Sequence, residues 1–361
     1  MLKVLICDDS ALMRKILKQI ITDAPDLEVA GVARNGDDAV AKARELQPDV
    51  VTMDINMPGM DGITAMQHIL AEDIAPVLMV SSLTQEGAET TFEALALGAF
   101  DFVAKPGGTV TLDMSSVARE IVDKLKTACG KGTKSRLSRK RKPGRPQAVR
   151  TITGPVPATV SGKTAPSLKK KQSFKGVALG ISTGGPKTIF DVLPYLPQDL
   201  NAAIFITQHM PPTFTATFAK RIDNNCAMRC KEAEAGMVVK PGVIYLAKGG
   251  LHLCLRTTLT GDIIIRTPKR PATAFIPGID VMMESVLDVF GSDTVGVEMT
   301  GMGYDGADAM VQIKATGGIT IAESEETAIV FGMPKEAINR GGVDIIAPSY
   351  QIADEIIKAV G

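Results

Sequence analysis

The feature that most constrains the fold is a regular alternation of short apolar runs with segments of helical period. Near the start of the chain, five apolar runs of strand length each precede a segment with apolar residues every three or four positions. The expected strands span 2–7, 28–33, 50–53, 77–81 and 101–103, and the expected helices span 11–21, 37–46, 63–70, 86–97 and 115–127. This alternation is typical of a parallel sheet with helices on both faces. We expect a flavodoxin-like, doubly wound (βα)5 domain.

A basic segment divides the chain. Between Lys131 and Lys175 there are fourteen Lys or Arg residues and no Asp or Glu, although the 361-residue chain has a formal net charge of zero. Periodic apolar residues also vanish there, as in a flexible linker. The sequence therefore predicts a first domain at 1–128, a basic flexible linker at 129–174 and a second domain at 175–361.

Composition excludes several classes of protein. No apolar run approaches the ~20 residues of a membrane-spanning helix, so we expect no membrane insertion. The first apolar run contains Lys3 and is followed at once by two aspartates, which does not fit a signal peptide. Five scattered cysteines, an odd number, argue against a disulfide framework and favour a cytoplasmic location.

Charged and hydroxyl side chains follow the strands expected in the first domain. Asp8 and Asp9 follow the first strand, Asp54 the third, Ser81 the fourth and Lys105 the fifth. Because the carboxyl ends of parallel strands meet at one edge of a sheet, these side chains are expected in one crevice. Clustered carboxylates favour a hard cation such as Mg²⁺, and Lys105 adds a charge that suits a phosphoryl group.

The motifs in this part resemble those of a response-regulator receiver domain. They are DD at 8–9, D-x-N-M-P-G-M-D-G at 54–62, VSS at 80–82 and AKP at 104–106. The resemblance implies that Asp54 accepts a phosphoryl group from a partner histidine kinase. It further implies a Mg²⁺ site made by Asp8, Asp9, Asp54 and the Asn56 carbonyl. Ser81 and Lys105 are implied to contact the phosphoryl group. Phe102 occupies the switch position, where Tyr is common.

The second domain again alternates between strand-like and helical segments. Strands are expected at 176–180, 202–207, 295–299, 319–322 and 345–347, and helices at 184–196, 281–290, 305–316 and from 349 onward. Short antiparallel strands are expected at 242–246, 251–255 and 263–266. The pattern predicts a doubly wound, mostly parallel α/β domain with an antiparallel patch.

Three strand ends of this domain supply Ser182, His209 and Asp305. Ser182 lies in a G-x-S-x-G sequence, a short pattern that also fits a helix-capping serine or a phosphate-binding turn. Asp305 also fits a second interpretation, in which it serves only as the N-cap of the following helix. Together the three residues fit a catalytic triad, which is defined by geometry and not by chain order. The other histidines, His68 and His252, are expected to be structural.

The same three segments resemble the catalytic domain of the chemotaxis protein-glutamate methylesterases, the CheB family. They read GISTGGP, TQHMPP and TGMGYDGA. The resemblance implies that Ser182 is the nucleophile, His209 the general base and acid, and Asp305 the orienting carboxylate. It assigns the oxyanion donor to the Met302 backbone N–H and requires no metal or other cofactor in this domain. The implied substrates are glutamate methyl esters, and in many members glutamines, on the cytoplasmic helices of chemoreceptors.

Two other readings compete with an esterase. The basic segment contains Lys-Pro-Gly-Arg-Pro at 142–146, which would suit a receiver-controlled DNA-binding regulator. The second domain lacks the helix-turn-helix and aromatic signals of such regulators, so we expect no specific nucleic-acid partner. A degenerate adaptor without catalysis is disfavoured because all three triad candidates are present. Cys226 and Cys230 lack a second pair of zinc ligands.

Overall fold

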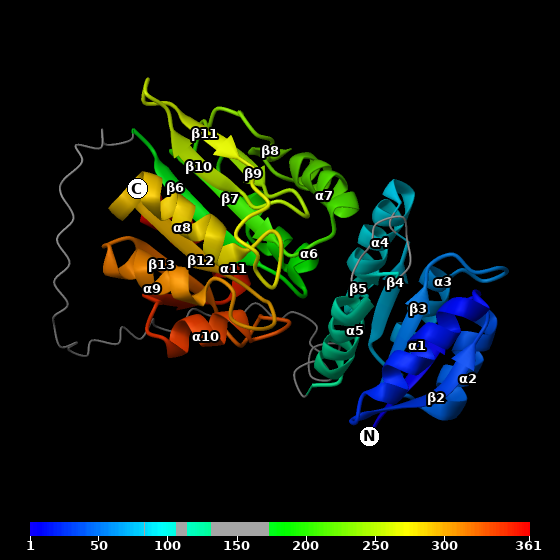
Figure 1. Cartoon of the computed structure of the whole chain (residues 1–361). Helices are drawn as coiled ribbons and strands as arrows, with labels where there is room; N and C mark the ends of the chain where they lie inside the picture. Colours follow the sequence, from blue (N-terminus) through cyan, green and yellow to red (C-terminus); the bar gives the residue numbers. More distant parts are fainter. Residues whose placement is uncertain (83, 106–113, 131–172) are drawn as a thin grey trace.

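The computed structural model describes residues 1–82, 84–105, 114–130 and 173–361, which form two α/β domains (Figure 1). Most of the basic segment lies outside these residues, so the linker expected at 129–174 stays a prediction. Among the described residues, no helix is both long enough and apolar enough to cross a membrane.

The first domain has one parallel sheet with the strand order β2-β1-β3-β4-β5, which confirms the flavodoxin-like fold. Its strands are β1 (Leu2–Cys7), β2 (Leu27–Ala33), β3 (Val50–Asp54), β4 (Val77–Ser81) and β5 (Asp101–Ala104). Its helices are α1 (Ala11–Asp23), α2 (Gly36–Leu46), α3 (Gly62–Ala71), α4 (Gln85–Leu97) and α5 (Met114–Ala128).

Local sequence explains where these elements begin and which way they face. Ser10, Asn35 and Asp61 each accept a hydrogen bond from the amide three residues later, which caps α1, α2 and α3. Side chains alternate along β1, so Leu5 packs in the same cluster as residues of α2 and α3, whereas Val4 packs with residues of α1 and α5. Both faces of the sheet are therefore covered.

The second domain has a seven-stranded sheet with the order β14-β13-β12-β6-β7-β9-β8, in which every neighbouring pair is parallel. Its strands are β6 (Lys175–Ile181), β7 (Ala202–Gln208), β8 (Arg229–Glu232), β9 (Val243–Leu246), β12 (Thr294–Glu298), β13 (Ile319–Glu323) and β14 (Ile345–Ala347). A separate antiparallel pair consists of β10 (Cys254–Thr257) and β11 (Ile263–Arg266).

Helices cover both faces of this sheet as well. They are α6 (Gly185–Thr188), α7 (Pro212–Asn225), α8 (Ile279–Phe290), α9 (Ala307–Ala315), α10 (Met333–Asn339) and α11 (Ser349–Val360), with 3-10 turns at Ile189–Asp191, Leu193–Tyr195 and Gly291–Asp293. Val177 and Leu179 of β6 pack in one cluster with residues of α7 and α11. Ala178, between them, packs with residues of α8, α9 and α10. The result is a three-layer α/β/α domain.

Several expectations for the second domain need correction. The segment 242–246 was expected to be antiparallel, but β9 pairs in parallel with β7 and β8 inside the main sheet. The helix expected over 184–196 is a short α6 followed by two 3-10 turns, because Pro194 cannot continue an α-helix. The strand expected at 251–255 begins only at Cys254. The sequence analysis also missed the strand β8 and the helices α7 and α10.

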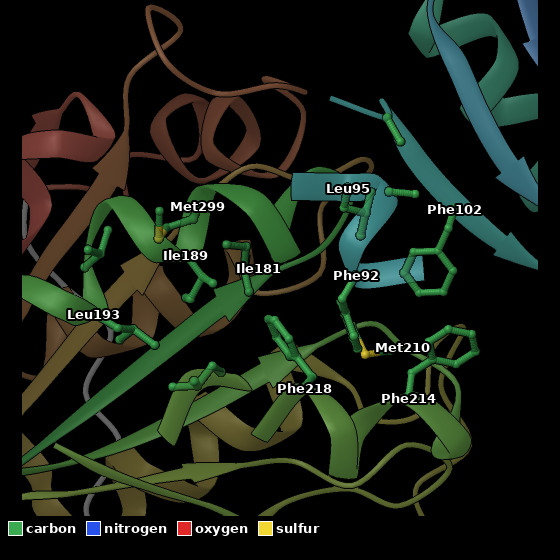
Figure 2. Packing of buried hydrophobic residues seen from close by; sticks show 14 of the residues in the cluster. Phe92, Leu95, Phe102, Ile181, Ile189, Leu193, Met210, Phe214, Phe218 and Met299 are labelled. Atoms are coloured by element: carbon green, nitrogen blue, oxygen red, sulfur yellow. The ribbon is translucent and has the colours of Figure 1, made fainter. Parts of the chain in front are cut away.

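The two domains meet through an aromatic contact. Phe102 of β5 stacks on Phe214 of α7 with ring centroids 4.6 Å apart, and Phe92 of α4 stacks on Phe218 at 5.2 Å. Figure 2 shows these four rings facing one another across the domain boundary. All four belong to one buried cluster that continues into both domains.

Candidate functional site

The first domain carries an acidic cluster at the carboxyl ends of its strands. Asp8 and Asp54 are buried, Asp9 is exposed, and one carboxylate oxygen from each lies within 4.8 Å of the others. The ammonium of Lys105 lies 2.7 Å from Asp54 Oδ2 and 3.1 Å from Asp8 Oδ2. A set of three carboxylates and one lysine has a net negative charge and offers only oxygen ligands, which fits Mg²⁺.

The electrostatics of this cluster favour a further cation. Burial raises the pKa of Asp54 above its ordinary value, and Asp8 and Asp9 add to the rise while Lys105 opposes it. Burial alone would lower the pKa of Lys105, but its contacts with Asp54 and Asp8 outweigh burial and raise it. Lys105 therefore stays charged, yet it does not fully offset the repulsion among the carboxylates.

The remaining receiver candidates lie around this cluster. Ser81 is buried at the end of β4, where it accepts a hydrogen bond from Thr91 Oγ1 at 2.7 Å. Asn56 is an exposed residue in the turn after β3. Phe102 lies in the contact between the two domains, where it is buried against Phe214.

In the second domain, the three triad candidates follow three neighbouring strands. Ser182 follows β6, His209 follows β7 and Asp305 follows β12. Strand β6 lies between the other two, so the direction of winding changes there. The crevice at such a switch point is the usual ligand site of an open α/β sheet.

The structure brings these side chains into one hydrogen-bonded chain. His209 Nδ1 lies 3.0 Å from Ser182 Oγ, and His209 Nε2 lies 2.8 Å from Asp305 Oδ2. The carboxylate accepts the Nε2 proton, which leaves the Nδ1 lone pair to accept the Ser182 hydroxyl. Nδ1 is therefore the basic atom that faces the serine.

Asp305 is held by the N-terminus of α8. Ile279 N–H donates to Asp305 Oδ2 at 2.8 Å, and Asp280 N–H donates to Oδ1 at 3.0 Å. Burial raises the pKa of Asp305, but the bonds from His209, Ile279 and Asp280 outweigh it and hold the pKa below its ordinary value. The carboxylate thus stays ionised beside the imidazole.

Two close approaches shape the surroundings of Ser182. Gly184 has φ 78°, a left-handed conformation that lets the chain turn sharply from β6 into α6. At Gly301, a Cβ atom would lie 2.9 Å from Ser182 Cβ, so only glycine lets the loop after β12 approach the serine so closely. No hydrogen bond among the described residues uses the Met302 amide, which leaves that N–H free for a substrate oxygen.

Several residues that support this crevice are not predicted by the sequence. Gln208 is buried and donates from Nε2 to the carbonyls of Ser182 and His209, which ties the two loops together. Asp280 accepts from Ala309 N–H at 2.9 Å and so joins α8 to α9. Gln208 could have been suspected from its place beside His209. Asp280 carries no such signal, because its partner lies on another helix.

Glu298 is also unexpected, because it is a carboxyl group on the buried central strand β12. Neither of its side-chain oxygens has a hydrogen-bond partner within the described parts of the chain. Burial raises its pKa well above the ordinary value, and the nearby charges of Asp305 and Asp280 raise it further. The protonated form of Glu298 is therefore favoured more than that of an exposed glutamate.

Fold and geometry together define a class of protein: an α/β domain with the side-chain arrangement of a serine hydrolase, joined to a receiver-type domain. The comparisons with known proteins are specific. Residues 177–356 match the family model described as CheB methylesterase, and residues 4–114 match the response regulator receiver domain.

Relatives cover the whole chain. A "Protein-glutamate methylesterase/protein-glutamine glutaminase 3" from Syntrophomonas wolfei is 56% identical over 100% of this chain and 99% of its own length. A protein-glutamate methylesterase/protein-glutamine glutaminase from Pyrococcus horikoshii is 43% identical over 99% of this chain and 94% of its own length. The crystal structure of the Thermotoga maritima CheB methylesterase catalytic domain matches with a TM-score of 0.51 and 39% identity, over 52% of this chain and 100% of that one. This chain belongs to the CheB family of protein-glutamate methylesterases.

Proposed function

We propose that the chain hydrolyses glutamate methyl esters on the cytoplasmic helices of chemoreceptors, and deamidates glutamines there, under control of a phosphorylated receiver domain. The observation that carries this proposal is the hydrogen-bonded chain from Ser182 through His209 to Asp305. The relatives named as methylesterase/glutaminase give the substrate class. An enzyme that acts on these substrates would work in the cytoplasm.

The first half of the reaction forms an acyl-enzyme. Ser182 Oγ attacks the ester carbonyl carbon while its proton moves to His209 Nδ1. Asp305 stabilises the imidazolium that results, and the free Met302 N–H donates to the oxyanion, a contribution of about 3–4 kcal/mol per donor. His209 then returns the proton to the leaving oxygen, and methanol departs.

The second half of the reaction restores the enzyme. A water molecule loses a proton to His209 and attacks the acyl carbon, and the Ser182 oxygen leaves as the hydroxyl with that proton. With a glutamine substrate the same steps release ammonia instead of methanol. The side chains that carry these steps need no metal, because His209 supplies the acid and the base.

The acidic cluster of the first domain serves a different reaction. Asp54 would accept a phosphoryl group from a histidine kinase, with Ser81 and Lys105 contacting its oxygens. Asp8, Asp9, Asp54 and the Asn56 carbonyl would hold Mg²⁺, which when bound offsets the negative charge of the carboxylates and the phosphoryl group. The cluster of carboxylate oxygens within 4.8 Å supports this assignment.

The first domain would restrain the second when Asp54 is unphosphorylated. Helix α7, which begins just after His209, carries Phe214 and Phe218 of the aromatic contact. Met302 Sδ lies 3.5 Å from Thr127 Oγ1 of α5, so the loop of the expected oxyanion donor also touches the first domain. Docking of the first domain would therefore limit access to the crevice, and phosphorylation would shift the population toward an open state.

A direct test is methanol release from methylated receptor membranes, measured with and without a small-molecule phosphodonor. We expect release by the wild-type chain, stimulation by the donor, and no release by a folded Ser182→Ala variant. Tyr195→Phe, a change at an exposed surface residue, is the matched control. Undiminished release by Ser182→Ala would show that another residue is the nucleophile.

A further inference from the structure

We propose that Phe275 is a positioning residue for His209, held against the imidazole by a strap, residues 271–278, that His252 fixes at both ends. This inference rests on the proposed triad. The two rings are stacked, with centroids 4.3 Å apart and planes 16° apart. Phe275 is 44% exposed, so its packing on His209 and not general burial accounts for its position.

The strap is an irregular segment between β11 and α8. His252 is fully buried beneath it, and both of its ring nitrogens take part in hydrogen bonds. Its Nε2–H donates to the Pro271 carbonyl at 2.8 Å, and its Nδ1 accepts from Gly278 N–H at 3.1 Å. One imidazole thus bridges the first and last residues of the strap.

Further bonds fix the middle of the strap. The Phe275 carbonyl accepts from Thr273 Oγ1 at 2.5 Å, and the Ile276 carbonyl accepts from Gly250 N–H at 3.0 Å. The backbone at Phe275 and Ile276 is therefore held in place, so the ring that stacks on His209 projects from a fixed position in the chain.

The strap also reaches the third member of the triad. Gly278 is the N-cap of α8, and the next two amides, those of Ile279 and Asp280, are the donors that hold Asp305. A single segment therefore positions the imidazole through Phe275 and the carboxylate through the helix N-terminus. Displacement of the strap would disturb both at once.

Stacking has two consequences for catalysis. A flat neighbour restricts rotation of the imidazole, so that Nδ1 stays directed at Ser182 while Nε2 stays directed at Asp305. In the transition state His209 gains a positive charge, which the electron-rich face of Phe275 stabilises at this separation. Phe275 also covers one face of a ring whose side chain is only 8% exposed.

The test compares Phe275→Leu, which keeps an apolar side chain without a π face, with Phe275→Tyr, which keeps the ring. Both are measured in the full-length, phosphodonor-activated protein on methylated receptor membranes. We expect kcat to fall roughly 2- to 30-fold in the Leu variant, with KM little changed, and to recover in the Tyr variant. Tyr195→Leu, at another exposed aromatic position, is the control for loss of a surface ring.

A second readout does not depend on activity. The chain has three histidines, so their ring-proton NMR signals are separable by single substitutions. Loss of the stacked ring should move the His209 signals downfield in Phe275→Leu, while the His252 signals stay in place because the strap remains fixed. Unmoved His209 signals, an unchanged kcat, or an effect on KM alone would each overturn the inference. Activity in Ser182→Ala would refute the triad instead, whatever the NMR spectra show.

Discussion

Phe102, a residue of β5 in the first domain, is stacked on Phe214, a residue of the helix that begins three positions after His209. The acidic cluster proposed to accept the phosphoryl group and the crevice proposed for the esterase reaction are therefore linked by one strand and one ring pair. Lys105 contacts Asp54 at one end of this path, and the His209 imidazole lies at the other.

The ring contact predicts that weakening the interface activates the unphosphorylated enzyme. Phe92→Ala removes a ring that packs on Phe214 and Phe218 from the first domain, and leaves the second domain intact. Loss of such an interface residue should raise basal methanol release roughly tenfold and reduce stimulation by a phosphodonor. Phe92→Leu should be intermediate. A chain starting near Lys175 should be at least as active as the Phe92→Ala variant and should not respond to the phosphodonor. If this chain is no faster than the unphosphorylated full-length enzyme, the first domain does not block the crevice.

The acidic cluster predicts a Mg²⁺-dependent phosphorylation at Asp54. Incubation with a small phosphodonor should label the wild-type chain, and labelling should be lost in Asp54→Asn and in the presence of a chelator. Asp37→Asn, at an acidic residue in the first turn of α2, should be labelled normally. Equal labelling of the wild type and Asp54→Asn would refute the assignment.

The buried carboxyl group of Glu298, whose pKa is raised in the folded chain, predicts an unusual dependence of stability on pH. The pKa of Glu298 is raised in the folded state, so between its ordinary pKa and its folded pKa the folded chain binds a proton that the unfolded chain does not. The free energy of unfolding is therefore greatest below the ordinary pKa of Glu and falls as pH rises toward the folded pKa. Glu298→Gln removes this titration. In denaturant unfolding, the free energy of unfolding of the variant should rise relative to that of the wild type by up to about 1.4 kcal/mol per pH unit across that range. Burial raises the pKa of Asp280 to about 6, so its titration also lowers the free energy of unfolding as pH rises. Asp280 is present in both proteins, so this contribution cancels when they are compared.

A constant difference between the two proteins from pH 5 to pH 8 would show that Glu298 is ionised in the folded chain. It would also mean that the carboxyl group has found a partner that the described residues do not supply.

The strap predicts that His252→Ala destabilises the second domain. The substitution leaves the Pro271 carbonyl and the Gly278 N–H without their partner and creates a cavity at a fully buried position. The free energy of unfolding should fall by about 2–5 kcal/mol. His68→Ala, at an exposed residue of α3, should change it by no more than about 0.5 kcal/mol. Equal melting temperatures for the two variants would show that His252 does not hold the strap.

The sequence is enough to predict the fold of the first domain, because each strand is a short apolar run and the helices α1 to α4 each begin at a capping residue. Asp8, Asp54 and Lys105 could be placed at one sheet edge from strand order alone. In the second domain the same logic places Ser182, His209 and Asp305 at neighbouring strand ends. The local sequence pattern therefore predicts site residues well when they follow a buried strand directly.

The errors share a different physical cause. Strand β8 reads Arg-Cys-Lys-Glu, a polar sequence that becomes a strand only because β9 offers it a partner. The direction of β9 likewise depends on its pairing with β7, which no local pattern reveals. Phe275 and His252 lie in irregular segments, and their roles arise from contacts with residues distant in the chain. Sequence periodicity carries no information about such contacts.

The position of β6 in the middle of its sheet has a consequence for synthesis of the protein. Ser182 and His209 are separated by 27 positions, but Asp305 lies 96 positions beyond His209. A nascent chain that has emerged from the ribosome only through α7 contains the serine and the histidine, yet it lacks β12 and the aspartate that follows. By then the first domain is complete. The domain proposed to restrain the enzyme is therefore synthesised before the proposed triad is complete. A chain that terminates before Asp305 would have no esterase activity that needs restraint.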